Sequence, residues 1–195
     1  MNYFEVFGLP RRLRIDADEL QRRFYALSRL HHPDVHQAAS AEEQARALEA
    51  SARVNAAYRA LRDPIARVEY LVRLEEGKET PNGAAVKPKA PPELLEEMFE
   101  IQEALEAARA GGLDDASRAT LRDQRERLLE RYRVEEGRLA GELAEAWDLA
   151  PDGERGTVLA VCKEALATRA YLGTVIEDLS AVLAEDEARV SNRRH

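Results

Sequence analysis

Three of the four histidines in this sequence stand close together, in the segment Leu30-His31-His32-Pro33-Asp34-Val35-His36. Imidazole and carboxylate groups at this density can bind a metal ion or move a proton. Pro33 argues against a metal site, because its ring prevents the histidines from sharing one helical face. No further carboxylate or cysteine is spaced to complete a ligand set. We therefore expect neither a metal nor a cofactor here.

Asp34 suits a different chemistry, the binding of a partner protein. Its carboxylate can accept a bidentate arginine, and Pro33 stiffens the loop that presents it. Arg22 and Arg29, with Arg23 beside them, stand opposite the apolar stripe of the preceding helix and place basic groups near the loop. Two plainer interpretations stay open. His-Pro-Asp also occurs by chance as ordinary turn chemistry, and arginines often form only a solvated helix face.

The elements that flank this loop are predicted to be helices. Asp16 and Ser40 each stand three residues before a glutamate, which is the pattern of a helix start. The first of these helices must end before Pro33. The second carries Leu48, Val54, Tyr58 and Leu61 on its apolar side and ends near Pro64, which suits the first turn of a short third helix. The pattern is that of a helical hairpin with short flanking helices.

The composition favours helices along the whole chain. Ala, Leu, Glu and Arg dominate, and only 10 glycines and 8 prolines occur among 195 residues. Helix breakers gather near residues 77–91, which therefore form a predicted linker. We expect an all-α protein with a first domain at 1–76, a linker at 77–91, a three-helix bundle at 92–190 and a tail at 191–195. One long helix of the bundle is predicted from about Asp115 to Trp147, with Trp147 as an anchor that packs the bundle together.

Charge and hydropathy exclude several classes of function. The formal net charge of -8 disfavours a general attraction to nucleic-acid phosphates. Cys162 is the only cysteine, so no internal disulfide is expected, and no glycine-rich phosphate loop occurs. No apolar stretch approaches the roughly 20 residues of a membrane span, and the N-terminus lacks the pattern of a leader. We expect a cytoplasmic protein with no nucleic-acid or membrane partner.

The first helix of the predicted bundle carries apolar residues on two sides. Its core stripe is predicted to be Leu94, Met98, Ile101, Leu105 and Ala108. Leu95 and Phe99 fall away from this stripe, among glutamates, and Tyr171 is similarly displaced on the last helix. Apolar side chains surrounded by acids favour a partner site. Single exposed apolar residues are also common, and a broad core would give the same pattern, so periodicity leaves both interpretations open.

Three motifs, taken together, resemble a J domain. They are YFEVFGLP at 3–10, His32-Pro33-Asp34, and VNAAYRALRDP at 54–64. The resemblance implies that residues 1–76 form a J domain, in which His32, Pro33 and Asp34 dock on an ATPase chaperone of the DnaK class and trigger hydrolysis of its ATP. Arg22 and Arg29 would then meet an acidic surface of that chaperone, mainly raising the association rate.

Nearly the whole chain is similar to the HscB family. The similarity is carried by DPIARVEYL at 63–71, LLEEMFEIQE at 94–103, and Tyr171-Leu172. In that family an acidic and apolar face of the C-terminal bundle binds the IscU-type scaffold protein on which iron-sulfur clusters are built. Carried over to this sequence, the face comprises Leu95, Glu96, Phe99, Glu100, Glu103 and Tyr171. Some eukaryotic relatives carry N-terminal Cys-x-x-Cys motifs, and their absence here implies the bacterial type.

The resemblance implies a non-enzymatic adaptor that stimulates an HscA-type ATPase and delivers the scaffold protein to it. Two alternatives remain open. A J protein for general unfolded clients would usually carry a glycine-phenylalanine-rich segment or cysteine-rich repeats, which this sequence lacks. A helical nucleic-acid-binding protein could use the arginine-rich first block, against the acidic total charge. An enzyme is least expected, because no nucleophile, base or cofactor constellation is visible.

Overall fold

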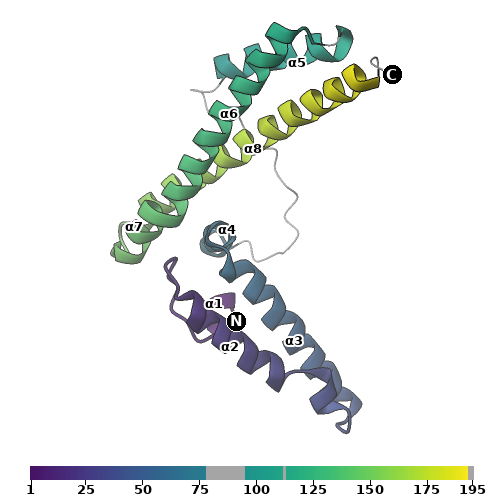
Figure 1. Cartoon of the computed structure of the whole chain (residues 1–195). Helices are drawn as coiled ribbons and strands as arrows, with labels where there is room; N and C mark the ends of the chain where they lie inside the picture. The colour runs from purple at the N-terminus through teal and green to yellow at the C-terminus, as the bar shows by residue number, and fades with distance from the viewer. Residues whose placement is uncertain (78–94, 112, 193–195) are drawn as a thin grey trace. The chain divides into compact units, whose positions relative to one another are not determined.

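The computed structural model describes residues 1–77, 95–111 and 113–192, apart from the side chains of 96–98, 109–111 and 190–192. Every regular element in these ranges is helical, as Figure 1 shows, which confirms the predicted all-α class. The chain divides into two compact units: Met1–Gly83 with Arg138–Cys162, and Ala84–Gly137 with Lys163–His195. Most of the predicted linker at 77–91 and the end of the predicted tail at 191–195 lie outside the described residues.

The first unit begins with four helices, α1 (Tyr3–Val6), α2 (Ala17–Leu30), α3 (Ala41–Arg62) and α4 (Pro64–Glu75). Helices α2 and α3 lie side by side as an antiparallel hairpin (Figure 1). The connection between them contains the short 3₁₀ helix η1 (Pro33–His36). The predicted hairpin with short flanking helices is therefore present.

Side-chain caps fix where these helices begin. The Asp16 carboxylate accepts the Glu19 amide at 2.9 Å, and Ser40 forms a complete capping box with Glu43. The Ser40 amide and hydroxyl donate to the Glu43 carboxylate, and these bonds lower its pKa. The Glu19 carboxylate does not accept the Asp16 amide in return, because it pairs with Arg23 at 2.5 Å. The predicted helix starts are thus correct, although only the second forms the full box.

A buried core holds the hairpin together. Its buried members include Phe4, Leu20, Val54, Leu61 and Val68. The guanidinium of Arg67 is also buried and donates to the carbonyls of Leu61 and Leu13, and its burial lowers its pKa. Leu48, which its position on the apolar side of α3 placed in the core, is instead 62% exposed, and the smaller Ala47 is buried beside it.

A segment from far along the chain completes the first unit. Helix α6 (Asp115–Arg138) runs into the π-helix η3 (Leu139–Leu143) and then α7 (Ala144–Leu149), where the sequence predicted one uniform helix over 115–147. Since a π-turn holds more residues than an α-turn, the residues after it face a different side. The Trp147 indole is buried and donates to the Arg11 carbonyl at 3.2 Å. This tryptophan therefore anchors the hairpin unit and not, as its place in the bundle suggested, the bundle.

The Asp148 carboxylate also joins this later segment to the loop between α1 and α2. It accepts the amide of Leu13 at 2.7 Å and that of Arg14 at 2.9 Å, and the Arg14 side chain pairs with Glu145 at 2.9 Å. These bonds explain why residues 138–162 cluster with the hairpin. The compact units thus divide the chain differently from the boundaries 1–76 and 92–190, which stay a prediction about independently folding parts.

The second unit is the predicted three-helix bundle. It contains α5 (Leu95–Gly111), α6 and most of α8 (Arg155–Asn192). Its core joins all three helices through Ile101, Leu105, Ala108, Leu121, Leu128, Leu172, Val175, Leu179, Val182 and Leu183. The predicted α5 stripe is therefore buried where it is described; the Met98 side chain and Leu94 lie outside the described residues.

One buried carboxylate ties the bundle together at the start of α6. Asp186 on α8 accepts the Leu113 amide at 3.1 Å and the Arg118 guanidinium at 2.7 Å. The hydrogen bond from Arg118, followed by that from the Leu113 amide, lowers the pKa of Asp186. This carboxylate is therefore held in its charged form, which matters for the pH dependence of the bundle.

Candidate functional site

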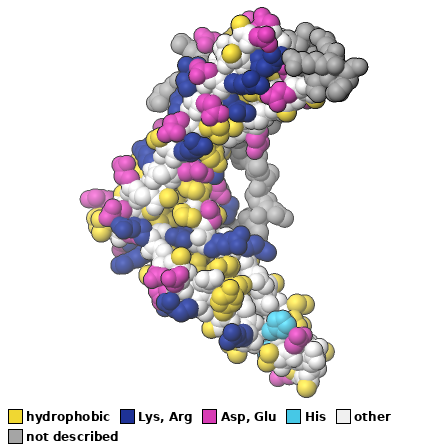
Figure 2. Space-filling view, in the orientation of Figure 1, with side chains coloured by type: hydrophobic (Ala, Val, Ile, Leu, Met, Phe, Trp, Pro, Cys, Tyr) yellow, Lys and Arg dark blue, Asp and Glu magenta, His cyan; other side chains and the backbone are white. Residues whose placement is uncertain are grey.

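The connection between α2 and α3 places the His-Pro-Asp tripeptide on the surface. Pro33 occupies the first turn of η1, where its fixed φ is favourable, and the Val35 amide donates to the His32 carbonyl at 3.0 Å. Figure 2 shows the loop histidines (cyan) on the molecular surface, beside acidic side chains. The tripeptide is therefore an ordered turn that remains accessible to a partner.

The hydrogen bonds of this turn leave the Asp34 carboxylate open. The Asp34 amide donates to His32 Nδ1 at 3.3 Å. The same ring nitrogen lies 3.5 Å from an Asp34 carboxylate oxygen. The side chain of Asp34 is 73% exposed, with only a 3.4 Å contact from the Gln37 amide. An incoming cation can reach it.

The structure sorts the three arginines of α2 into two groups. Arg22 and Arg29 are exposed, and neither has an ion-pair partner among the described residues. Arg23 instead pairs with Glu19 and donates to the carbonyls of Phe7 and Gly8 at 2.5 and 2.9 Å. Arg23 thus stabilises the turn after α1 and is not free to bind a partner. The sequence had grouped it with Arg22 and Arg29 among the basic groups near the loop.

Sequence analysis missed an aromatic residue on the same helix. Tyr25 lies three residues after Arg22 and is 54% exposed, with its hydroxyl accepting from Gln21 at 3.3 Å. Residues three apart share a helix face, so this spacing was the signal that could have found it. Leu30, Val35 and Leu48 add further exposed apolar side chains to the first unit.

A second exposed surface lies on α5. Leu95 is 53% and Phe99 76% exposed, and Glu103 follows at the same four-residue spacing. Glu100 is also exposed beside this line. We call Leu95, Phe99, Glu100 and Glu103 the α5 face. A phenylalanine this exposed, next to acids, is unusual for a surface that stays in water.

The acids of the α5 face differ from the other acids of the bundle. Glu100 and Glu103 have no ion-pair partner among the described residues. On α6 and α8, by contrast, arginines neutralise many acids, as in the pairs Asp115–Arg118, Asp123–Arg127, Glu136–Arg169 and Glu187–Arg122. No ion pair among the described residues therefore offsets the charges of Glu100 and Glu103 beside the exposed Phe99 ring.

The other two residues predicted for this surface have different outcomes. Tyr171 is half-buried against the bundle core, and this burial raises its pKa. It belongs to the same three-helix unit but is not exposed as Phe99 is. The Glu96 side chain lies outside the described residues. The grouping of all six residues therefore stays a prediction.

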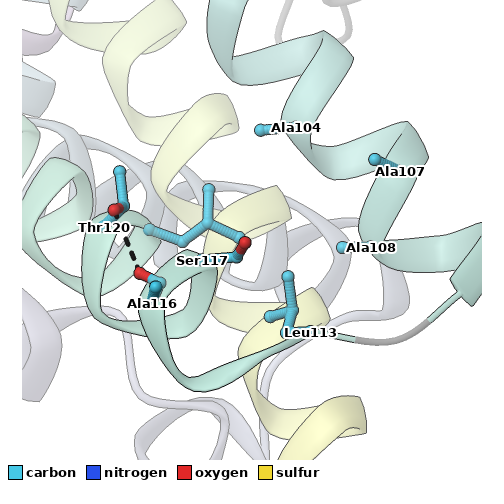
Figure 3. A pocket seen from close by; sticks show the side chains of 8 residues that line it. Ala104, Ala107, Ala108, Leu113, Ala116, Ser117 and Thr120 are labelled. Atoms are coloured by element: carbon cyan, nitrogen blue, oxygen red, sulfur yellow. Dashed lines mark hydrogen bonds between the residues drawn. The ribbon is translucent and has the colours of Figure 1, made fainter.

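Three further features of the described residues bear on chemistry: possible metal-ligand groups, a hollow in the bundle and the single thiol. It contains no group of three or more His, Cys, Asp or Glu side chains arranged to hold a metal ion. A hollow of about 310 Å³ between α5 and α6 is lined largely by alanines, and the Thr120 hydroxyl beside it donates to the Ala116 carbonyl at 3.0 Å (Figure 3). Burial raises the pKa of the Cys162 thiol, which makes it a poor nucleophile.

No helix in the described ranges combines the length and the apolar surface that crossing a lipid bilayer would require.

Comparison with known proteins identifies the family of the chain. Residues 2–70 match the DnaJ domain family. Proteins named Co-chaperone protein HscB homolog, from two strains of Vibrio cholerae serotype O1, are 35% identical over 153 residues, spanning 78% of this chain and 86% of theirs.

Two solved structures are similar along nearly the whole chain. Chaperone HscB from Vibrio cholerae superimposes with a TM-score of 0.61 at 25% identity, covering 95% of this chain and 99% of that one. Human co-chaperone protein HscB gives a TM-score of 0.59 at 24% identity, covering 93% and 81%, and supports the fold. With its J domain, its helical fold and its extended similarity to these co-chaperones, the chain belongs to the HscB family.

Proposed function

We propose that this protein stimulates ATP hydrolysis by a chaperone of the HscA/DnaK class and delivers an IscU-type iron-sulfur scaffold protein to it. In this role the protein is an activator in the cytoplasm and not itself an enzyme. The partner holds the ATP. Each of the two exposed surfaces binds one partner, and the chain links the two binding events.

The accessible Asp34 carboxylate, held in an ordered turn, is the observation that carries the proposal. A carboxylate without a charged partner can accept two parallel hydrogen bonds from an arginine of the ATPase. Arg22 and Arg29, both exposed and unpaired among the described residues, supply the opposite charge for an acidic surface on that partner. Such charges mainly raise the association rate, while the Asp34 contact supplies specificity.

The α5 face supports the scaffold half of the proposal. Phe99 can bury its ring in an apolar pocket of the scaffold, which is how aromatic residues dominate many interfaces. Glu100 and Glu103 can then pair with basic residues that surround that pocket. We further propose that Glu96 and Tyr171 extend this surface.

A J protein for general unfolded clients is the second candidate. The exposed apolar side chains of the first unit, such as Val35 and Leu48, would suit it if they bound extended chains. That function would not require the α5 face. Replacement of Leu95 and Phe99 therefore separates the two candidates.

The test is single-turnover ATP hydrolysis by the HscA-type chaperone, with and without the scaffold protein. We expect the wild-type chain to accelerate hydrolysis. Asp34→Asn should lower the acceleration about tenfold or more, because a hydrogen-bonded charge pair contributes on the order of 1.5–3 kcal/mol. Leu95→Ala with Phe99→Ala should remove only the part that depends on the scaffold.

Glu49→Gln on the exposed side of α3 is the matched control for the loss of one carboxylate charge. It should stimulate as the wild type does. If Asp34→Asn also stimulates fully, the tripeptide is ordinary turn chemistry and the proposal fails. If the double variant handles the scaffold normally, the second candidate is favoured.

A further inference from the structure

Two side chains outside the His-Pro-Asp tripeptide hold the turn in place from opposite ends. The first is His36, whose Nε2 lies 2.9 Å from the carbonyl oxygen of Leu30. Leu30 is the last residue of α2, so its carbonyl has no amide partner within the helix. Because a carbonyl can only accept, Nε2 must carry the hydrogen, and it does so in both the neutral ring and the protonated ring. The bond closes the turn onto α2.

The second side chain is Gln44, in the first turn of α3. Its amide nitrogen donates to the carbonyls of Gln37 and Ala39, each at 3.1 Å. These two residues follow η1 directly, so Gln44 fastens the far end of the turn to α3. The His-Pro-Asp turn is therefore attached to both helices of the hairpin, and neither attachment uses the tripeptide itself.

Both side chains also border the group that the partner must reach. A hollow of about 270 Å³ is lined by Pro33, Asp34, His36, Gln37 and Gln44. Asp34 thus shares one depression with the two residues that attach the turn. A change in either attachment would change where the Asp34 carboxylate lies relative to α2 and its arginines.

We propose that His36 and Gln44 are positioning residues for recognition of the ATPase partner. They hold the turn in its docking shape before the partner arrives, so that binding does not have to order it. The inference rests on the proposed function for its effect on the ATPase. Without either attachment, the half-saturating concentration of the protein should rise roughly three- to tenfold, as expected for losing one or two hydrogen bonds. The maximal rate should be nearly unchanged, because the bound turn is the same.

Two substitutions of Gln44 test the inference, because the stability of α3 and the positioning of the turn predict opposite orders for them. Near the start of a helix, glutamate is favourable and lysine unfavourable. In Gln44→Glu, however, a carboxylate faces two carbonyls and cannot donate, whereas in Gln44→Lys an ammonium can donate to both. Positioning therefore predicts that Gln44→Lys works nearly as well as wild type and that Gln44→Glu is impaired.

Ala45 supplies the matched controls, because it is the exposed neighbour of Gln44 on α3. Ala45→Glu and Ala45→Lys introduce the same charges one residue away without reaching the turn. Any effect of added charge on the partner will appear in these controls and can be subtracted. For the other attachment, His36→Ala should be impaired, and His36→Gln should recover much of the loss because its amide can place a donor near the position of Nε2.

A readout on the free protein keeps this inference separate from the proposed function. The amides of Val35 and Ala39 donate to the carbonyls of His32 and His36, at 3.0 Å each. Their hydrogen exchange should quicken several-fold in Gln44→Glu and His36→Ala and stay near wild type in Gln44→Lys and His36→Gln. The thermal midpoint should follow the opposite order, with Gln44→Glu at or above Gln44→Lys, because glutamate stabilises the start of α3 and lysine does not.

The outcomes are distinct. Faster exchange together with a raised half-saturating concentration supports the inference. Wild-type exchange in Gln44→Glu overturns it, and so does equal impairment of Gln44→Glu and Gln44→Lys after the Ala45 controls. If the wild-type chain fails to stimulate the ATPase, the proposed function fails, and the exchange rates still decide whether the two residues position the turn.

Discussion

The α2–α3 connection and the α5 face are both exposed, yet they present recognition groups in different ways. In the connection, backbone and side-chain hydrogen bonds fix a turn, and a single carboxylate, Asp34, is displayed on it. On α5, a regular helix carries Leu95 and Phe99 outward, beside two exposed glutamates that have no ion-pair partner within the described ranges. The first surface depends on the shape of its backbone, and the second depends on which side chains a rigid helix exposes.

This difference predicts which substitutions should impair each surface. A turn with one essential charge should fail after one substitution, whether in the charge or in the bonds that place it. A helical face should lose affinity in steps, because apolar area and charge are shared among several residues. The following experiments test that contrast.

The largest expected effect is on binding of the scaffold protein. Leu95→Ala with Phe99→Ala should weaken scaffold binding by about 10- to 100-fold, since each buried anchor contributes on the order of 1 kcal/mol or more. Asp34→Asn should leave that affinity unchanged. Titration calorimetry with the scaffold alone measures both. A loss of scaffold affinity in Asp34→Asn would show that the two surfaces do not act separately.

Removing charged side chains beside either surface should have a smaller effect, on the rate of association with the partner. Glu100→Gln with Glu103→Gln should slow association with the scaffold by a few-fold and weaken its dependence on salt, because charges around an interface chiefly steer the encounter. Arg22→Ala with Arg29→Ala should likewise slow association with the ATPase by a few-fold and weaken its dependence on salt. Stopped-flow association rates at two or more ionic strengths provide the measurement. An unchanged salt dependence in either pair would mean that these charges are merely solvated.

The bundle beneath the α5 face should depend on pH through Asp186. Its folded pKa is lowered below the usual value of about 4, so its stabilising bonds are present above that pH and are lost as the pH falls through the lowered pKa. Asp186→Asn should therefore lower the thermal midpoint at pH 7, and the difference from wild type should shrink below pH 4. A difference that stays constant from pH 7 to pH 2 would contradict this assignment.

The smallest effect should come from Leu48, next to the connection. Because it is 62% exposed, Leu48→Ala should change the free energy of unfolding by less than about 0.5 kcal/mol. Leu61→Ala is the matched control, since Leu61 is fully buried on the same helix and should cost about 2–5 kcal/mol. Urea denaturation of both variants makes the comparison. Similar losses would mean that Leu48 is packed after all.

Local patterns in the sequence predicted the parts of the fold that depend on neighbouring residues. Asp16 and Ser40 mark helix starts because a cap bonds to an amide only three residues away. The stripe of Ile101, Leu105 and Ala108 follows from helical spacing. Helical spacing left the exposure of Phe99 open, and the resemblance to the HscB family favoured it; the structure exposes both Phe99 and Asp34.

Only the tertiary structure decided which elements cover one another. Periodicity shows that a helix has an apolar side, but it does not show which partner buries that side. Leu13 and Asp148 are 135 residues apart, and no local pattern predicts that their hydrogen bond joins α7 to the hairpin unit. For the same reason Leu48 was expected to be buried, and Arg23 was expected to be free. The sequence by itself determined the helices and their apolar stripes, because those depend on short-range spacing. The tertiary structure decided which sides are covered and by which partners, because these depend on long-range packing.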